Sequence, residues 1–193
     1  MIKRTVVVRP VGHFLHGYHF RTTSFGDITP ICMLFQPMYV PHVDIPFAGM
    51  PEEYRSGAHR WSVSDPDIGA KLIEGLGGDV LDSLLRIDTP DKFLVWAEHH
   101  GRLSSERFPM FTHALAGRRD RAIALAEKEL ESNRRSVSLS RPWAAVNIRR
   151  LHRLIRILES GQARTNRLLR TFERVNARRV GVEAWWHWSP VVE

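Results

Sequence analysis

Residues 142–159 read PWAAVNIRRLHRLIRILE, and their apolar positions recur with the period of an α-helix. Five apolar side chains follow one another at intervals of four, three, four and three residues, which places them on one side of a helix that faces a core. These are Ala144, Ile148, Leu151, Ile155 and Leu158. Arg149, Arg153 and Arg156 fall together on another face. The segment therefore predicts an amphipathic helix with a basic face.

A second basic helix is expected over residues 163–179, after the break at Ser160 and Gly161. Its apolar side consists of Leu168, Leu169, Phe172 and Val175. Four arginines follow at intervals of three or four residues, at Arg167, Arg170, Arg174 and Arg178. Thirteen arginines and only two acidic residues lie between Arg134 and Arg179. Few of these charges can be neutralised by acids one helical turn away.

Helix start signals extend this helical half upstream to residue 65. Asp65 before Pro66 and Thr89 before Pro90 each combine an N-cap residue with a proline at the first helical position. Ser104 or Ser105 is expected to open a further helix.

Gly117 is expected to end that helix and Asp120 to cap the next, RAIALAEKELESN. The segment FTHALAGRRDRAIALAEKELE resembles one helical hairpin of the tetratricopeptide type, with small Ala122 and Ala126 for close packing. No second copy follows about 34 residues away, so a repeat array is not expected. The turn carries Arg118, Arg119, Asp120 and Arg121, which either contact a carboxylate of a partner or keep the hairpin soluble.

The first 63 residues have a different composition, with β-branched and aromatic residues separated by glycine and proline. This pattern is typical of short strands joined by turns. We expect strands near residues 5–8, 15–22, 31–36, 43–47 and 60–63. Prolines cannot donate to a sheet, so they should mark edges, ends or bulges. The predicted fold is α+β, with a small antiparallel sheet in residues 1–64 and five to six helices, arranged as hairpins, in residues 65–193 of one integrated domain.

Composition limits the class of protein. Apolar residues make up 43% and charged residues 25% of the chain, as in an ordinary globular domain. The single cysteine, Cys32, allows neither an intramolecular disulfide nor a cysteine-based metal site. No segment has the length of a signal-peptide core or a membrane span, so we expect a cytoplasmic protein without a membrane partner.

No catalytic constellation is visible in the sequence. The sequence lacks a phosphate loop, a dinucleotide fingerprint, a GxSxG elbow and a Cys-His pair. His13, His16 and His19 recur every three residues, but on a strand His16 points away from the other two. We expect no catalytic residues, no metal and no cofactor, and an enzyme ranks third among the functional interpretations.

Charge is divided unevenly along the chain. Residues 1–100 carry a net charge of −3 and residues 101–193 a net charge of +10. Three interpretations remain open for the arginines of the second half. They form a solvated face that pairs with the acidic first half, they bind the phosphates of a nucleic acid, or they bind an acidic protein.

Three tryptophans, Trp185, Trp186 and Trp188, lie close together near the C-terminus. In one interpretation Trp185 and Trp188 fold back onto the protein while Trp186 and His187 cover the rim. In the other the rings serve a partner, for example by stacking on bases.

The run from Val11 to Val40 resembles uncharacterised bacterial α+β proteins, some of which are encoded beside toxins. From the basic helices we expect a non-catalytic binding or adaptor protein for an acidic protein partner, and the resemblance suggests one version of it, a toxin-neutralising factor of the immunity type. A nucleic-acid-binding protein is the alternative. The expected partner-binding residues are Arg149, Arg153, Arg156, Arg167, Arg170, Arg174, Arg178, Trp185, Trp186 and Trp188.

Overall fold

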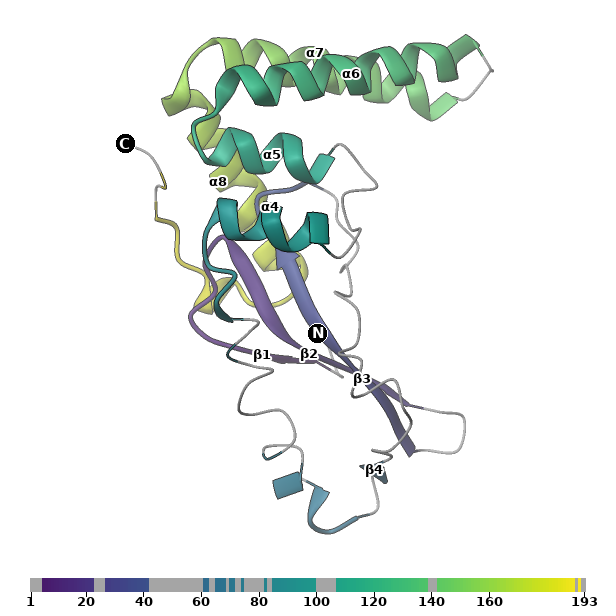
Figure 1. Ribbon diagram of the computed structural model, residues 1–193, viewed down its shortest axis with the longest axis vertical. Coiled ribbons are helices and arrows are strands. Elements are labelled where there is room, and N and C mark those ends of the chain that lie inside the picture. The colour runs from purple at the N-terminus through teal and green to yellow at the C-terminus, as the bar shows by residue number, and fades with distance from the viewer. Residues whose placement is uncertain are drawn as a thin grey trace. The chain divides into compact units, whose positions relative to one another are not determined.

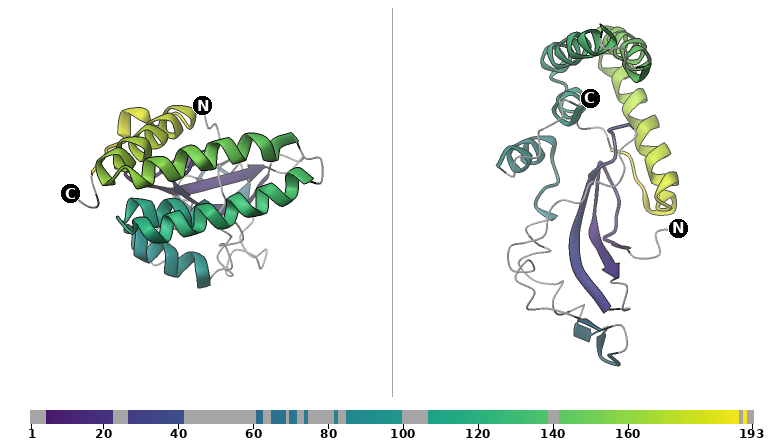
Figure 2. Two further views of the ribbon diagram at one scale, coloured as in Figure 1. Left: turned by 90° about the horizontal axis from the view of Figure 1, so that it is seen from above. Right: turned by 90° about the vertical axis from the view of Figure 1, so that its right-hand side faces the viewer.

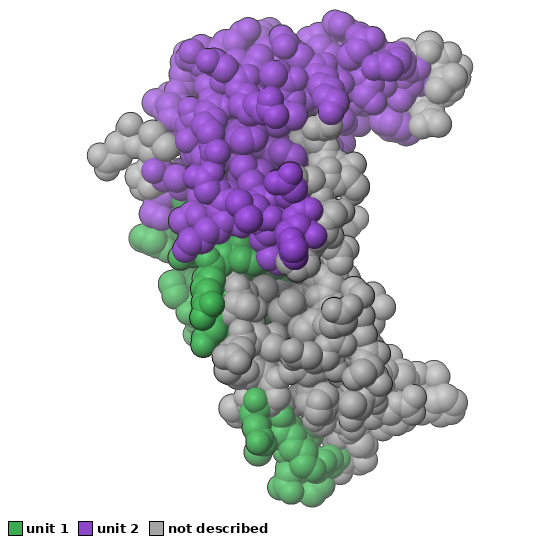
Figure 3. All heavy atoms as spheres, viewed as in Figure 1, with its two compact units in different colours: residues 1–38, 42–88, 176–187 green, residues 39–41, 89–175, 188–193 purple. Residues whose placement is uncertain are grey.

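A computed structural model of the chain has the expected α+β architecture, with a sheet followed by helices (Figure 1). It describes residues 5–22, 27–41, 61–62, 65–68, 70–71, 74, 82, 85–99, 107–138, 142–189 and 191. Two compact units make up the chain (Figure 3). The first comprises residues 1–38, 42–88 and 176–187, and the second comprises residues 39–41, 89–175 and 188–193. The boundary expected after residue 64 adjoins residues outside the described ranges and stays a prediction.

Four strands form an antiparallel sheet in the order β1-β2-β3-β4. Their bounds are Thr5–Val7 for β1, Phe14–Thr22 for β2, Asp27–Pro37 for β3 and Trp61–Ser62 for β4. β3 begins earlier than expected because it continues through Pro30, where its register with β2 shifts. Pro37 is the last residue of β3. Both prolines therefore occupy a bulge or an end, as predicted. The strand expected near residues 43–47 lies outside the described residues.

The core of the first unit joins the sheet to residues near the C-terminus. Its buried members are Val11, Leu15, Met38, Ala177, Val180 and Val182, and Val7 and Trp186 pack against them. Asn176 adds a buried hydrogen bond, in which its side-chain amide donates to the Met38 carbonyl at 2.7 Å. Residues more than 130 positions apart are thus held together by apolar contacts and by one polar bond.

The structure gives the bounds of five α-helices and one short 3₁₀ helix. They are α4 Pro90–His99, α5 Arg107–Leu115, α6 Arg119–Ser138, α7 Pro142–Glu159, α8 Gln162–Arg179 and η1 Glu183–Trp185. α7 has the predicted bounds, and the Thr89 hydroxyl accepts a hydrogen bond from the Lys92 amide at 3.3 Å, which confirms it as the cap of α4. α6 and α7 pack side by side within the second unit (Figure 2). The helix start expected at Ser104 or Ser105 lies outside the described residues.

The turn between α5 and α6 is closed at Gly117, as predicted. Gly117 has a φ of 73°, its amide donates to the Ala114 carbonyl, and the Arg118 amide donates to the His113 carbonyl. This is the Schellman arrangement that favours glycine. Asp120 is not the N-cap of α6, because the helix begins at Arg119 and the Arg118 carbonyl accepts from the Ala122 amide. The Asp120 carboxylate instead lies in the first turn, where the helix dipole favours it.

The buried side of α8 differs from the predicted one. Its buried residues are Thr165, Leu169, Glu173, Asn176 and Ala177. Val175, which was expected on the buried side, is 57% exposed. Three of the five buried residues are polar, so the apolar pattern alone pointed to the wrong edge of the helix. None of the described helices has both the length and the apolar character needed to cross a membrane.

Candidate binding surface

The arginines of α7 lie on its exposed side. Ala144, Leu151, Leu154 and Leu158 are buried, whereas Arg149, Arg150, Arg153 and Arg156 are exposed. We call these four arginines the α7 basic face. This division into a buried and an exposed side agrees with the predicted apolar side of the helix, and the structure adds Leu154 to that side.

No ion pair is found between the α7 basic face and an acidic residue in the described part of the chain. On α6 the situation is different, since Arg134 and Arg135 both contact the Glu131 carboxylate, at 3.7 and 3.8 Å. The charge of α6 is therefore partly neutralised within the helix. The charge of the α7 basic face is not balanced by any described carboxylate, so it is available to an external anion.

The four arginines expected on α8 are also exposed, but they are not equivalent. Arg178 forms a bidentate pair with Glu183, with N–O distances of 3.0 and 2.9 Å. This hydrogen bond and the charge of Glu183 raise the pKa of Arg178. Arg178 thus holds the segment after α8, while Arg167, Arg170 and Arg174 make no ion pair with a described residue.

The terminal tryptophans have different environments. Trp186 is half-buried against the core of the first unit and pairs with Val11, whose amide donates to the Trp185 carbonyl and whose carbonyl accepts from the His187 amide. Trp185 is 37% exposed, and the Arg9 guanidinium lies 3.6 Å from its ring centroid. Trp188 is half-buried. The segment does fold back onto the protein, but the assignment of Trp186 to the rim was wrong, because the pairing with Val11 turns its ring toward the core.

Trp143 and Val146 were missed as candidate site residues. Trp143 is 50% exposed and Val146 is 37% exposed, although both belong to an amphipathic helix. Arg150 and Arg153 follow Trp143 at seven and ten positions, so these four side chains share one side of α7. The sequence contains the signal for them, because Val146 and Trp143 lie four and seven residues before Arg150, at the spacing of one helix face.

Of the three N-terminal histidines, the structure describes the side chains of His13 and His16. His13 is buried, while the His16 ring packs near Phe14 and Phe35 and its Nε2 donates to the Ile87 carbonyl at 3.1 Å. Burial lowers the pKa of His16, against smaller opposing effects of the Ile87 carbonyl and Asp88. Among the described residues, no three His, Cys, Asp or Glu side chains form a group that could hold a metal ion.

Comparison with known proteins gives no relative. No family model, no curated protein and no solved structure matches the chain.

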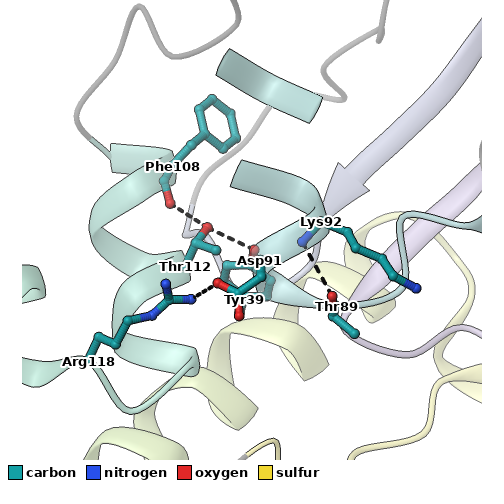
Figure 4. A network of polar contacts seen from close by, with 7 residues as sticks. All are labelled: Tyr39, Thr89, Asp91, Lys92, Phe108, Thr112 and Arg118. Atoms are coloured by element: carbon teal, nitrogen blue, oxygen red, sulfur yellow. Dashed lines mark hydrogen bonds and ion pairs between the residues drawn. The ribbon is translucent and has the colours of Figure 1, made fainter. Parts of the chain in front are cut away.

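A buried polar network supports the helices of the second unit (Figure 4). The Thr112 hydroxyl donates to the Phe108 carbonyl at 2.6 Å, so the Tyr39 hydroxyl must act as donor in its 2.9 Å bond to Thr112. Burial raises the pKa of Tyr39 against the opposing effect of its hydrogen bond to Thr112, and the charge of Glu173 also raises it. Tyr39 therefore stays a neutral donor, and this network has a structural role.

Proposed function

We propose that this protein is a non-catalytic binding protein that engages an acidic protein partner through the α7 basic face, with Arg167, Arg170 and Arg174 of α8 as further contacts. The observation that carries the proposal is the exposure of the α7 basic face without a described acidic partner. Complementary charge guides such partners together and selects among them.

Trp143 and Val146 favour a protein as the partner. They place exposed apolar area on the same side of α7 as Arg150 and Arg153. Tryptophan and arginine dominate the residues that carry most of the binding energy in protein interfaces. A surface built from these types can form an apolar contact surrounded by charge-assisted hydrogen bonds.

Nucleic acid is the second candidate, because guanidinium groups also match phosphates and Trp143 could stack on a base. The exposed apolar area of Trp143 and Val146 favours the protein partner over a duplex. A protein interface supplies an apolar core for such side chains, whereas a duplex is contacted mainly through its phosphates and sugars.

The test is a pair of fluorescence anisotropy titrations with labelled poly-L-glutamate and labelled duplex DNA at several salt concentrations. Exposed charge pairs contribute about 0.2 to 1 kcal/mol each, so Arg150→Gln combined with Arg153→Gln should weaken poly-L-glutamate binding by about 2- to 30-fold. Arg134→Gln combined with Arg135→Gln removes the same charge from α6, where both side chains contact Glu131, and should have little effect.

Two results would contradict the proposal. Tighter binding of the duplex, with a salt slope of about −0.9 per contacted phosphate that falls in the α7 variant, would give first place to nucleic acid. Failure of the wild-type protein to bind either polyanion at low salt would remove the basic face as a binding surface.

A further inference from the structure

The turn between α5 and α6 forms part of a pocket in the second unit. The pocket has a volume of about 450 Å³ and is lined by Gly117, Arg118, Arg119, Asp120, Arg121 and Gln162. This volume lies in the range of sites for small ligands, about 300 to 1,000 Å³. None of the lining residues belongs to the α7 basic face, so the pocket is independent of the proposed function.

The walls of the pocket are held by backbone and side-chain bonds. The Schellman turn at Gly117 fixes the backbone from which Arg118 and Arg119 project. Elsewhere in the lining, the Gln162 side-chain amide donates to the Ala114 carbonyl at 3.1 Å and to Asn166 Oδ1 at 2.8 Å. These bonds tie the first residue of α8 to the end of α5. The pocket is therefore built by two segments more than 40 residues apart in the sequence.

The lining carries three guanidinium groups and one carboxylate. Arg118 is oriented by an ion pair with Asp91 (Figure 4), and Arg119 Nε lies 3.7 Å from Asp120. Arg121 is exposed and makes no ion pair with a described residue. Arg121 thus remains available to a ligand, whereas Arg118 and Arg119 each lie beside a carboxylate.

The neighbouring His113 reports the sign of the local potential. Its pKa is lowered first by burial and then by the charges of Arg118 and Arg121, against the opposing effect of Asp91. The positive end of the α6 dipole adds to the same potential. An anion that enters the pocket would meet a positive field from the side chains and from the helix.

We propose that this pocket binds the phosphate monoester group of a small ligand. A phosphate monoester carries a charge of about −1.5 to −2 at neutral pH, which complements the excess of cations in the lining. Guanidinium groups bind phosphate oxygens in a bidentate manner, and the tetrahedral group accepts donors from several directions. The remaining volume accommodates the organic part of the ester.

The test measures binding of inorganic phosphate and of glycerol 3-phosphate to the full chain by isothermal titration calorimetry at constant ionic strength. Both should bind saturably, and Arg121→Gln should weaken binding about tenfold, since a charge-assisted hydrogen bond is lost. Arg134→Gln, the same substitution on α6 outside both the pocket lining and the α7 basic face, should leave phosphate binding unchanged. The pKa of His113, followed by NMR, should rise when phosphate is bound.

Three results would overturn the proposal: no saturable binding of either phosphate, equal weakening by Arg121→Gln and Arg134→Gln, or acetate binding as tightly as phosphate. Circular dichroism checks that each variant is folded, and Arg119→Gln provides a second pocket variant if Arg121→Gln is not. The two proposals fail separately. The effect of the α7 variant on poly-L-glutamate binding tests only the basic face. The effect of the pocket variants on phosphate binding tests only the pocket.

Discussion

Replacing Trp186 by alanine should destabilise the protein more than the same change at its neighbour Trp185. The two side chains have the same size and adjacent positions, but Trp186 packs against the core around Val11 and Val182, whereas Trp185 contacts Arg9 on its exposed side. Both variants keep the backbone bonds between Val11 and residues 185–187. The pair therefore isolates what each ring contributes.

The expected magnitudes follow from burial. Removing a fully buried tryptophan side chain costs about 3 to 5 kcal/mol, so the half-buried Trp186 should cost about 2 kcal/mol. Trp185 loses chiefly its cation–π contact with Arg9, which at an exposed site contributes about 0.5 to 1 kcal/mol. For a chain of this length, 1 kcal/mol corresponds to about 2 to 4 °C in Tm. Trp186→Ala should lower Tm by about 4 to 8 °C, and Trp185→Ala by no more than about 4 °C.

Urea unfolding followed by far-ultraviolet circular dichroism measures both variants without depending on tryptophan emission. The reasoning would be refuted if Trp185→Ala cost as much as Trp186→Ala, or if neither changed the midpoint. Either outcome would mean that the segment after α8 does not dock through Trp186. The tryptophans would then return as candidates for contact with a partner.

Three further changes test the fold. Asn176→Ala should lower the free energy of unfolding in urea by about 1 to 3 kcal/mol, because the buried Met38 carbonyl loses its donor. Asn133→Ala is the control and should be nearly neutral, since the Asn133 side chain bonds only within α6. Gly117→Ala should cost about 1 kcal/mol in thermal unfolding, because the φ of 73° is unfavourable for a residue with a Cβ, and an unchanged Tm would argue against the Schellman turn. The pKa of His16 is lowered, so the unfolded chain binds the extra proton and stability should fall as pH drops below about 6.5. His16→Gln should reduce this pH dependence, as Tm measured at several pH values would show.

Local chemistry predicted the helices well. The caps at Thr89 and Gly117 and the bounds of α7 follow from a few residues each, because capping and apolar spacing depend on neighbours within one or two turns. The sheet was predicted in type, but the predicted strand over residues 31–36 is shorter than β3, which continues through the irregularity at Pro30 to Asp27.

Contacts between distant residues could not be predicted in this way. The buried side of α8 contains Glu173 and Asn176, and Asn176 is buried because its amide reaches the Met38 carbonyl. Such a bond depends on how the chain folds back, which no spacing rule contains. The same limit applies to Trp186, whose partner Val11 lies near the opposite end of the sequence.

The α7 basic face lowers the stability of the helix that carries it. Arg153 has like-charged neighbours at Arg149, Arg150 and Arg156, at helical spacings of three or four residues, and each such pair is unfavourable by about 0.2 to 0.5 kcal/mol. α6 avoids this cost by placing Glu131 beside Arg134 and Arg135. The repulsion on α7 is relieved when a carboxylate or phosphate approaches from outside, so the free energy that the isolated helix lacks becomes available on binding. This coupling is why an exposed basic helix with Trp143 beside it favours a binding role over a purely solvated one.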